Sequence, residues 1–185
     1  MPMQLTYYYT EAELREAVGR MTILIDSREK ENRQITEFFD RKKIPYVIRK
    51  LETGDYSAMI DGYTLERSFV IERKHSIQEL YRNLTAERQR FDAELLRACN
   101  AGIRTVLLIE NTTMEDLYTG DPFHGIPPGK MADLLLEKSG EYGINAFFVH
   151  DYYSGRIIAD LLEYALIKAL MSSPANPENV RAYEF

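Results

Sequence analysis

Apolar residues fall into short continuous runs, separated by longer stretches in which they recur at helical spacing. The runs at residues 22–25, 69–71 and 105–109 have the length of a strand and polar residues at their ends. This pattern is typical of strands buried within a sheet. Shorter strands are expected at residues 46–50 and 146–149. A carboxylate directly follows each of the three apolar runs.

Two further strands are expected at residues 56–60 and 63–65, on either side of Asp61-Gly62. Asp-Gly is a strong signal for the two-residue turn of a β-hairpin. Part of the sheet should therefore be antiparallel, which argues against a purely parallel, doubly wound fold.

The stretches between the expected strands carry the apolar spacing of helices. Thr10, with Glu13 three residues later, fits a capping box and predicts a short helix from Glu11 to about Gly19. Further helices are expected at residues 33–43, 77–101, 130–142 and 154–171, and a loop rich in proline and glycine at residues 119–129. Strands alternating with helices predict an α/β fold in which helices flank a mixed β-sheet.

A length of 185 residues suits one compact domain with its own core. We place this domain at residues 21–171, between an N-terminal extension (1–20) and a polar C-terminal tail (172–185). The single cysteine, Cys99, excludes an internal disulfide and a thiolate zinc site. Because the sequence has neither a membrane-length apolar run nor the pattern of a secretory signal, we expect a cytoplasmic, reducing location and no membrane partner.

Charge bears on nucleic-acid binding mainly through its distribution. The chain carries 23 basic and 29 acidic residues, and this net charge of −6 argues mildly against a general nucleic-acid binder. Residues 21–101 carry 15 basic and 14 acidic residues, whereas residues 102–185 carry 6 and 12. The balanced block at 21–101 would therefore become basic if a metal ion neutralised a few of its carboxylates.

Three carboxylates and one lysine stand out within this balanced block. Asp26 and Glu72 end apolar strands, and Asp55 lies in a Gly-Asp turn. Lys74 is two residues beyond Glu72, so these two side chains share one face of a strand and Arg73 points to the other. Asp55 and Glu72 offer the hard oxygen ligands that Mg²⁺ prefers. Lys74 can orient an attacking water or help to deprotonate it, and it can offset negative charge that develops at a phosphate.

The Glu-Arg-Lys tripeptide also has a purely structural interpretation. Alone, such a tripeptide is more typical of a solvated, salt-bridged strip than of a catalytic strand. Here it closes an apolar strand, 17 residues after the aspartate of a Gly-Asp turn. That order is the pattern of restriction-endonuclease-like nucleases, and the spacing alone leaves the two interpretations evenly matched.

A larger set of motifs resembles the XPF-type structure-specific endonuclease family. The chain carries Asp26-Ser27-Arg28-Glu29, then Gly54-Asp55, then Glu72-Arg73-Lys74, in the order of that family. The resemblance extends over about residues 21–171, which would form an XPF-type nuclease domain. It implies a restriction-endonuclease-like fold, with a mixed sheet flanked by helices, and a metal-dependent endonuclease that hydrolyses phosphodiester bonds in branched or otherwise structured DNA.

The resemblance implies a metal site and a catalytic lysine. Asp26, Asp55 and Glu72 would bind Mg²⁺ or Mn²⁺, with Glu29 nearby, and Lys74 would be the catalytic lysine. The family usually has an aspartate four residues after this lysine. That position is Gln78 here, and the neighbouring Glu79 is a candidate substitute.

The arginines of the same region have two interpretations each. Arg28 and Arg73 are candidates for phosphate contacts or for structural pairing with the acidic cluster. Arg82, Arg88, Arg90 and Arg97 are candidates for contacts along a DNA backbone. A long helix also needs a solvated face, which explains these last four residues equally well.

We expect a homodimer that binds DNA. The apolar stripe of the helix at 154–171 is wider than one core contact requires, and the nuclease domains of the resembled family tend to pair. The alternative is a helix buried on both sides within one domain. The family's C-terminal helix-hairpin-helix pair has no counterpart after Met171, so we expect a free-standing nuclease domain of bacterial or phage origin.

Two other functions compete with an active DNA endonuclease. The first is a non-catalytic DNA-binding or partner subunit with a nuclease-like fold. The second is an enzyme of the same fold that acts on RNA or as an exonuclease. Asp55, Glu72 and Lys74 are all present, which favours the active endonuclease.

Overall fold

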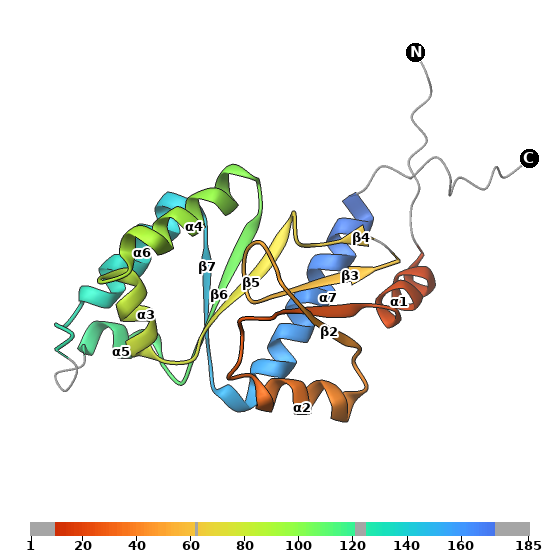
Figure 1. Ribbon diagram of the computed structural model, residues 1–185, viewed down its shortest axis with the longest axis horizontal. Helices are drawn as coiled ribbons and strands as arrows, with labels where there is room; N and C mark the ends of the chain where they lie inside the picture. Colours follow the sequence, from red (N-terminus) through yellow and green to blue (C-terminus); the bar gives the residue numbers. More distant parts are fainter. Residues whose placement is uncertain (1–9, 62, 121–124, 173–185) are drawn as a thin grey trace, which may run out of the picture.

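A seven-stranded sheet crosses the molecule in the computed structural model, which describes residues 10–61, 63–120 and 125–172. The strand order is β2-β1-β3-β5-β6-β7, and β4 pairs with β3 (Figure 1). The strands are β1 (Thr22–Asp26), β2 (Tyr46–Arg49), β3 (Tyr56–Ile60), β4 (Tyr63–Thr64), β5 (Phe69–Lys74), β6 (Arg104–Glu110) and β7 (Asn145–Val149).

The sheet is mixed, as the hairpin signal predicts. β1 runs parallel to β2 and antiparallel to β3, which is also antiparallel to β5, while β5, β6 and β7 are parallel. Tyr56, the first residue of β3, pairs with Ile25 near the end of β1 and with Ile71 of β5. This register brings Asp26, Asp55 and Glu72 to one edge of the sheet.

Helices cover both faces of the sheet. They are α1 (Glu11–Gly19), α2 (Arg33–Lys42), α3 (Ile77–Leu84), α4 (Arg88–Asn100), α5 (Met114–Thr119), α6 (Lys130–Tyr142) and α7 (Ser154–Ser172). Figure 1 shows α3, α4, α5 and α6 on one side of β6 and β7, and α2 and α7 on the other. Among the described residues, no helix combines the length and the apolar character that crossing a membrane requires.

Alternation along the strands divides the core into two clusters. Val106 and Leu108 of β6 face one cluster, which includes buried residues of α2 and α7. Leu107 and Ile109 of the same strand face the other, which includes buried residues of α3, α4 and α6. Each face of the central strands is therefore covered, which explains the continuous apolar runs in the sequence.

The helix predicted at 77–101 is two helices, and this boundary prediction is wrong. The Thr85 hydroxyl donates a hydrogen bond to the Tyr81 carbonyl at 2.6 Å, and the Glu87 N–H donates to the Arg82 carbonyl at 2.8 Å. These bonds close α3 and turn the chain before α4 begins at Arg88. The apolar spacing continues across the break because both helices face the same core cluster.

The apolar stripe of α7 is used within the chain. Ile158, Leu162 and Leu166 are completely buried. Ile157 and Leu161 are partly buried and pack against the same cluster. Most of the stripe is therefore used within the chain, so the width of the stripe no longer argues for a dimer through α7. The homodimer itself stays a prediction.

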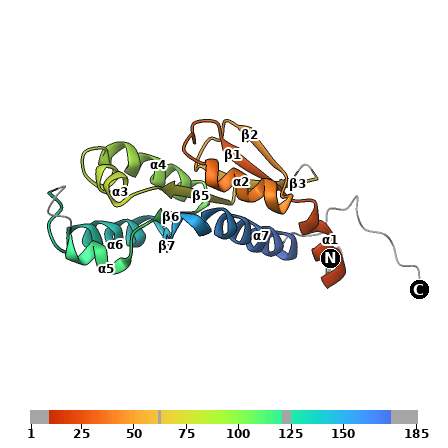
Figure 2. The same ribbon diagram turned by 90° about the horizontal axis from the view of Figure 1, so that it is seen from below.

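Helix α1 is packed onto the domain rather than separate from it. The side chain of Thr10 and the side chain of Glu13 each bond the other's backbone N–H, so the predicted capping box is present. Ala17 is buried in the cluster that includes α7, and Figure 2 shows α1 beside the end of α7. The segments 1–9 and 173–185, which belong to the predicted extension and tail, lie outside the described residues.

Candidate active site

A pocket of about 250 Å³ lies where the turn before β3, the end of β5 and helices α3 and α4 meet. Asp55, Glu72, Lys74 and Glu29 all line it. The Lys74 ammonium lies 2.7 Å from the Glu72 carboxylate, so the two side chains point the same way from β5. The strand alternation therefore produces the predicted acid–lysine pair.

Asp55 is held by the backbone of the neighbouring strand. Its N–H donates to the Ile71 carbonyl, and its carboxylate accepts a hydrogen bond from the Arg73 N–H, both at 2.8 Å. Burial, followed by repulsion from Glu72, raises the pKa of the Asp55 carboxyl well above its ordinary value. Because the negative charges of Asp55 and Glu72 repel each other, a cation bound between them would relieve this repulsion.

The turn that presents Asp55 needs a glycine. Gly54 has a φ of +74°, a left-handed conformation that residues with a side chain rarely adopt. A Cβ at this position would lie 2.7 Å from the Val70 Cβ. Gly54 therefore lets the turn pass close against β5 and brings Asp55 beside Glu72.

Lys74 is a buried cation surrounded by carboxylates. Its side chain is 5% exposed and lies over the Phe91 ring, with its Nζ 5.2 Å from the ring centroid. Burial opposes the charge, but Glu72 and the more distant Asp55 and Glu79 outweigh it and raise the pKa of the ammonium. The carboxylates around Lys74 therefore favour its charged form.

Glu79 occupies the pocket at the start of α3. The Ser76 side chain accepts a hydrogen bond from the Glu79 N–H, and the Glu79 carboxylate accepts one from the His75 N–H. The same carboxylate lies 3.9 Å from the Lys74 Nζ. Glu79 thus stands near the Glu72–Lys74 pair, in keeping with its candidacy as the substitute for the aspartate expected at Gln78.

Arg73 points away from Lys74 into a buried polar network. Its guanidinium binds both carboxylate oxygens of Glu110 at 2.7 Å, and it contacts Glu29 at 2.6 Å. Ser154, at the start of α7, donates its hydroxyl to Glu110. Arg73 therefore ties β5, β6, α7 and the loop after β1 together, and it holds Glu29 at the wall of the pocket.

The structure does not bring Asp26 into the pocket. Its side chain is fully buried, and it accepts hydrogen bonds from the Leu51 N–H at 2.6 Å and from the Arg28 guanidinium at 2.7 Å. Burial favours the neutral form, but these bonds outweigh it and hold the pKa of Asp26 below its ordinary value. Arg28 also donates to the Leu51 carbonyl, so Asp26 and Arg28 together fix the loop that leads to Asp55.

The arginines of α3 and α4 separate into two groups. Arg82, Arg90 and Arg97 line the pocket that holds Asp55, Glu72 and Lys74. Arg88 does not, and it pairs instead with Asp92 of its own helix and Glu137 of α6. Helical spacing accounts for the separation within α4, because Arg90 and Arg97 lie seven residues apart on one face and Arg88 lies on the opposite face.

Glu94 is a pocket residue that the sequence analysis did not single out. It lies on α4, is half-buried and lines the pocket with Asp55 and Glu72. The pKa of Arg28 is raised first by Asp26, and Asp55 and Glu94 contribute further. The available signal was the spacing of Glu94 four residues after Arg90, which places both on one face of the helix.

Asp55 and Glu72 together could supply two carboxylate ligands to a hard divalent cation. Among the described residues, no three acidic, histidine or cysteine side chains converge closely enough to hold a metal ion. Asp55 and Glu72 supply two carboxylates whose mutual repulsion a cation would relieve. Mg²⁺ is commonly bound by one or two carboxylates, with water and substrate phosphate completing its shell, so this donor pair suits it.

Comparison with known proteins places the chain in a family. Residues 25–161, well over half of the chain, match the family model of the ERCC4 domain. The chain belongs to the ERCC4 domain family. This ERCC4 domain begins within β1 and ends within α7, so it contains every pocket residue described above and leaves α1 outside.

Solved structures show the fold of this ERCC4 domain. XPF from Aeropyrum pernix has a TM-score of 0.59 at 16% identity, over 78% of this chain and 61% of that chain. The same protein in complex with DNA has a TM-score of 0.59 at 17% identity, over 80% and 66%. The chain thus spans less than two thirds of those relatives, and it shares their restriction-endonuclease-like fold. No curated protein matches the chain by sequence.

Proposed function

We propose that this ERCC4 domain is a divalent-metal-dependent endodeoxyribonuclease that hydrolyses phosphodiester bonds in branched or otherwise structured DNA. The observation that carries the proposal is the assembly of Asp55, Glu72 and Lys74 in one pocket at the ends of two strands. Membership of a nuclease-type family supports the reaction class. The complex of Aeropyrum pernix XPF with DNA supports DNA as the substrate.

Each of the three side chains has a separate task in this proposal. Bound Mg²⁺ or Mn²⁺ would polarise the scissile phosphate and lower the pKa of an attacking water. Asp55 and Glu72 would hold the ion, with Glu29 at the same wall of the pocket. Lys74 stays charged, and its ammonium offsets negative charge that develops on the phosphate.

A non-catalytic DNA-binding subunit is the second candidate. The observation that favours it is the direct Glu72–Lys74 ion pair, in which the lysine occupies one of the carboxylates that an active enzyme needs for metal. An active enzyme must let Glu72 share its oxygens between Lys74 and the ion. The two candidates differ in whether divalent metal binds and cleavage follows.

A cleavage assay separates these possibilities. End-labelled single-stranded, duplex, flap and forked DNA, with RNA in parallel, would be incubated with the full chain and Mg²⁺, Mn²⁺, Ca²⁺ or EDTA. We expect internal cuts in branched DNA with Mg²⁺ or Mn²⁺, and metal binding without cleavage in Ca²⁺. DNA binding with no cutting in any metal would establish the non-catalytic subunit, and products released only from ends would indicate an exonuclease.

We further propose that the protein is a homodimer and that it works in a reducing, intracellular location.

A further inference from the structure

The carboxylate of Glu87, in the turn between α3 and α4, is surrounded by three cationic or amide donors. The Arg82 guanidinium lies 3.1 Å from it, and the Arg90 guanidinium donates a 2.6 Å hydrogen bond. The side-chain amide of the buried Asn83 donates a third bond, at 3.0 Å. Glu87 stands directly before α4 but makes no capping bond to that helix, so its side chain is directed to these donors instead.

This set of donors has the chemistry of a phosphate site. Guanidinium groups bind carboxylate and phosphate oxygens in the same way, with charge-assisted hydrogen bonds. An amide donor and the N-terminal end of a helix add to the attraction for an anion. The carboxylate of Glu87 therefore stands where an oxyanion of a ligand would make the same contacts.

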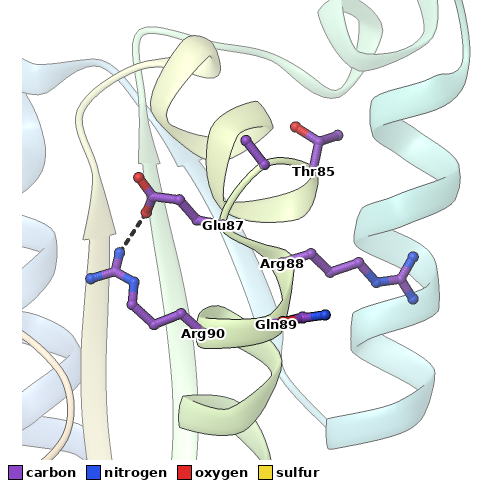
Figure 3. A pocket seen from close by; sticks show the side chains of 6 residues that line it. Thr85, Glu87, Arg88, Gln89 and Arg90 are labelled. Atoms are coloured by element: carbon purple, nitrogen blue, oxygen red, sulfur yellow. Dashed lines mark hydrogen bonds and ion pairs between the residues drawn. The ribbon is translucent and has the colours of Figure 1, made fainter.

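The position of the two arginines connects this cluster to the catalytic pocket. Arg82 and Arg90 line that pocket together with Asp55, Glu72 and Lys74. Arg90 also borders the surface hollow at residues 85–90. Figure 3 shows Arg90 and Glu87 directed to one side of the turn and Arg88 to the other, toward α6. The side chains of Arg82 and Arg90 are mainly exposed, so a strand of DNA can reach them.

We propose that Arg82 and Arg90 bind a DNA backbone phosphate beside the scissile one, and that Glu87 occupies this phosphate site until DNA displaces it. The inference rests on the proposed function, because it assumes that DNA enters the pocket. Glu87 holds the two guanidinium groups together in the absence of DNA. It also competes with DNA, since its carboxylate must leave before the phosphate can bind.

The test measures DNA affinity in the absence of cleavage. Fluorescence anisotropy would follow binding of forked DNA to the full chain in Ca²⁺, across a series of salt concentrations. Arg82→Gln and Arg90→Gln should each weaken binding about tenfold, and each should lower the slope of log affinity against log salt by about 1. Glu87→Gln should tighten binding several-fold, because it removes the competing charge. Glu87→Ser should do the same while keeping a residue suited to a helix start.

Two arginines serve as matched controls. Arg88→Gln changes a neighbour on the same helix that faces α6, and Arg156→Gln removes the same charge from α7, where Arg156 pairs with Asp160. Both should leave affinity within about twofold of the parent, since neither removes a phosphate contact. In the double variant Glu87→Gln/Arg90→Gln, the gain from removing Glu87 should largely disappear, because its competition acts through the arginines.

The outcomes separate this inference from the proposed function. A parent chain that binds no DNA would contradict the proposed function and this site together. If the parent binds and cuts DNA but Arg88→Gln weakens binding as much as Arg90→Gln, the phosphate site is wrong and the nuclease stands. Unchanged or weaker binding by both Glu87 variants, with unchanged melting temperatures, would overturn the role of Glu87.

Discussion

At the scale of single residues, the end of β5 sends its side chains in two directions, with the proposed catalytic residues on one face and a structural arginine on the other. The side chains of Glu72 and Lys74 pair with each other in the pocket, whereas the guanidinium of Arg73 is 4% exposed and binds Glu110 and, at the pocket wall, Glu29. Strand alternation could predict this division from the sequence. It could not identify Glu110 as the partner of Arg73, because that contact depends on the parallel pairing of β5 with β6.

Asp26 shows where the prediction from spacing reaches its limit. The residue ends β1 as expected, but its oxygens accept bonds from Arg28 and from the Leu51 backbone. Leu51 lies 25 residues further along the chain, so nothing in the local sequence reveals it as a partner. The structure supports a role for Asp26 in positioning the Asp55 loop, and metal binding by Asp26 stays a prediction.

Asp26→Asn should reduce stability in a pH-dependent way. Because the pKa of Asp26 is lowered by folding, its carboxylate stabilises the folded chain above the pKa of the unfolded state, near 4, and this contribution is lost as pH falls. In EDTA at pH 7 we expect a loss of about 1–3 kcal/mol, from lost charge-assisted hydrogen bonds. Urea unfolding at pH 7, 5 and 3 would measure it, and the gap between variant and parent should narrow toward pH 3. Equal stability at pH 7 with lost metal binding would instead make Asp26 a ligand.

Arg73→Met should destabilise the chain strongly, because it leaves the carboxylate of Glu110 buried without its cation. Breaking a buried pair in this way costs about 3–5 kcal/mol. The double variant Arg73→Met/Glu110→Met removes both charges and should recover part of that loss. Chemical denaturation of the two variants provides the comparison. A double variant less stable than the single one would show that Arg73 is not needed to neutralise Glu110.

At the scale of elements, strands and helices can be predicted from the sequence where burial produces one clear pattern of apolar residues. β1, β5 and β6 are buried on both faces and appear as continuous apolar runs. The break between α3 and α4 could not be predicted, because Leu80, Leu84, Phe91 and Leu95 keep helical spacing across it. The signal missed for α5 was local, since Thr113 and Asp116 form a capping box.

The turn between β2 and β3 gives a prediction at this scale. Gly54→Ala should cost about 1–3 kcal/mol from its left-handed backbone alone. It should also lower cleavage, because the crowded Cβ would push Asp55 away from Glu72. Gly140→Ala is a suitable control, as Gly140 lies in α6 with open space around it and an ordinary φ. Thermal unfolding and cleavage rates of both variants would measure the effects. A Gly54→Ala chain as stable and active as the control would contradict this account of the turn.

At the scale of the whole molecule, the topology makes the site from segments far apart in sequence. Order along the chain predicts that Asp55 and the Glu72–Lys74 strand meet, because a hairpin connects them. It does not predict that α4 closes the pocket with Phe91, Arg90 and Glu94. α4 reaches the pocket because α3 and α4 pack against β6. The spacing of apolar residues shows that these helices have a buried face, but it does not show which strand that face packs against.

The homodimer is the prediction that belongs to this scale. Since α7 is used within the chain, the exposed apolar side chains Leu136 of α6 and Phe147 of the edge strand β7 are the better candidates for a dimer surface. Light scattering at tens of micromolar should give twice the chain mass, and Phe147→Ser should shift the mass toward that of a monomer. Tyr164→Ser, which removes an exposed aromatic of α7, should have no such effect. A parent chain that stays monomeric would refute the dimer.

The central claim is that Glu72 and Lys74 form the catalytic pair of a metal-dependent nuclease. Single-turnover cleavage of forked DNA in Mg²⁺ by the parent, Lys74→Ala and the longer Lys74→Met tests it most directly. Metal titration and melting curves of the same proteins would identify any loss of fold. We expect both variants to bind metal and DNA while cleavage falls by about 10²–10³, the usual effect of losing one such electrostatic group. Cleavage by folded Lys74→Met at the parent rate would contradict the claim.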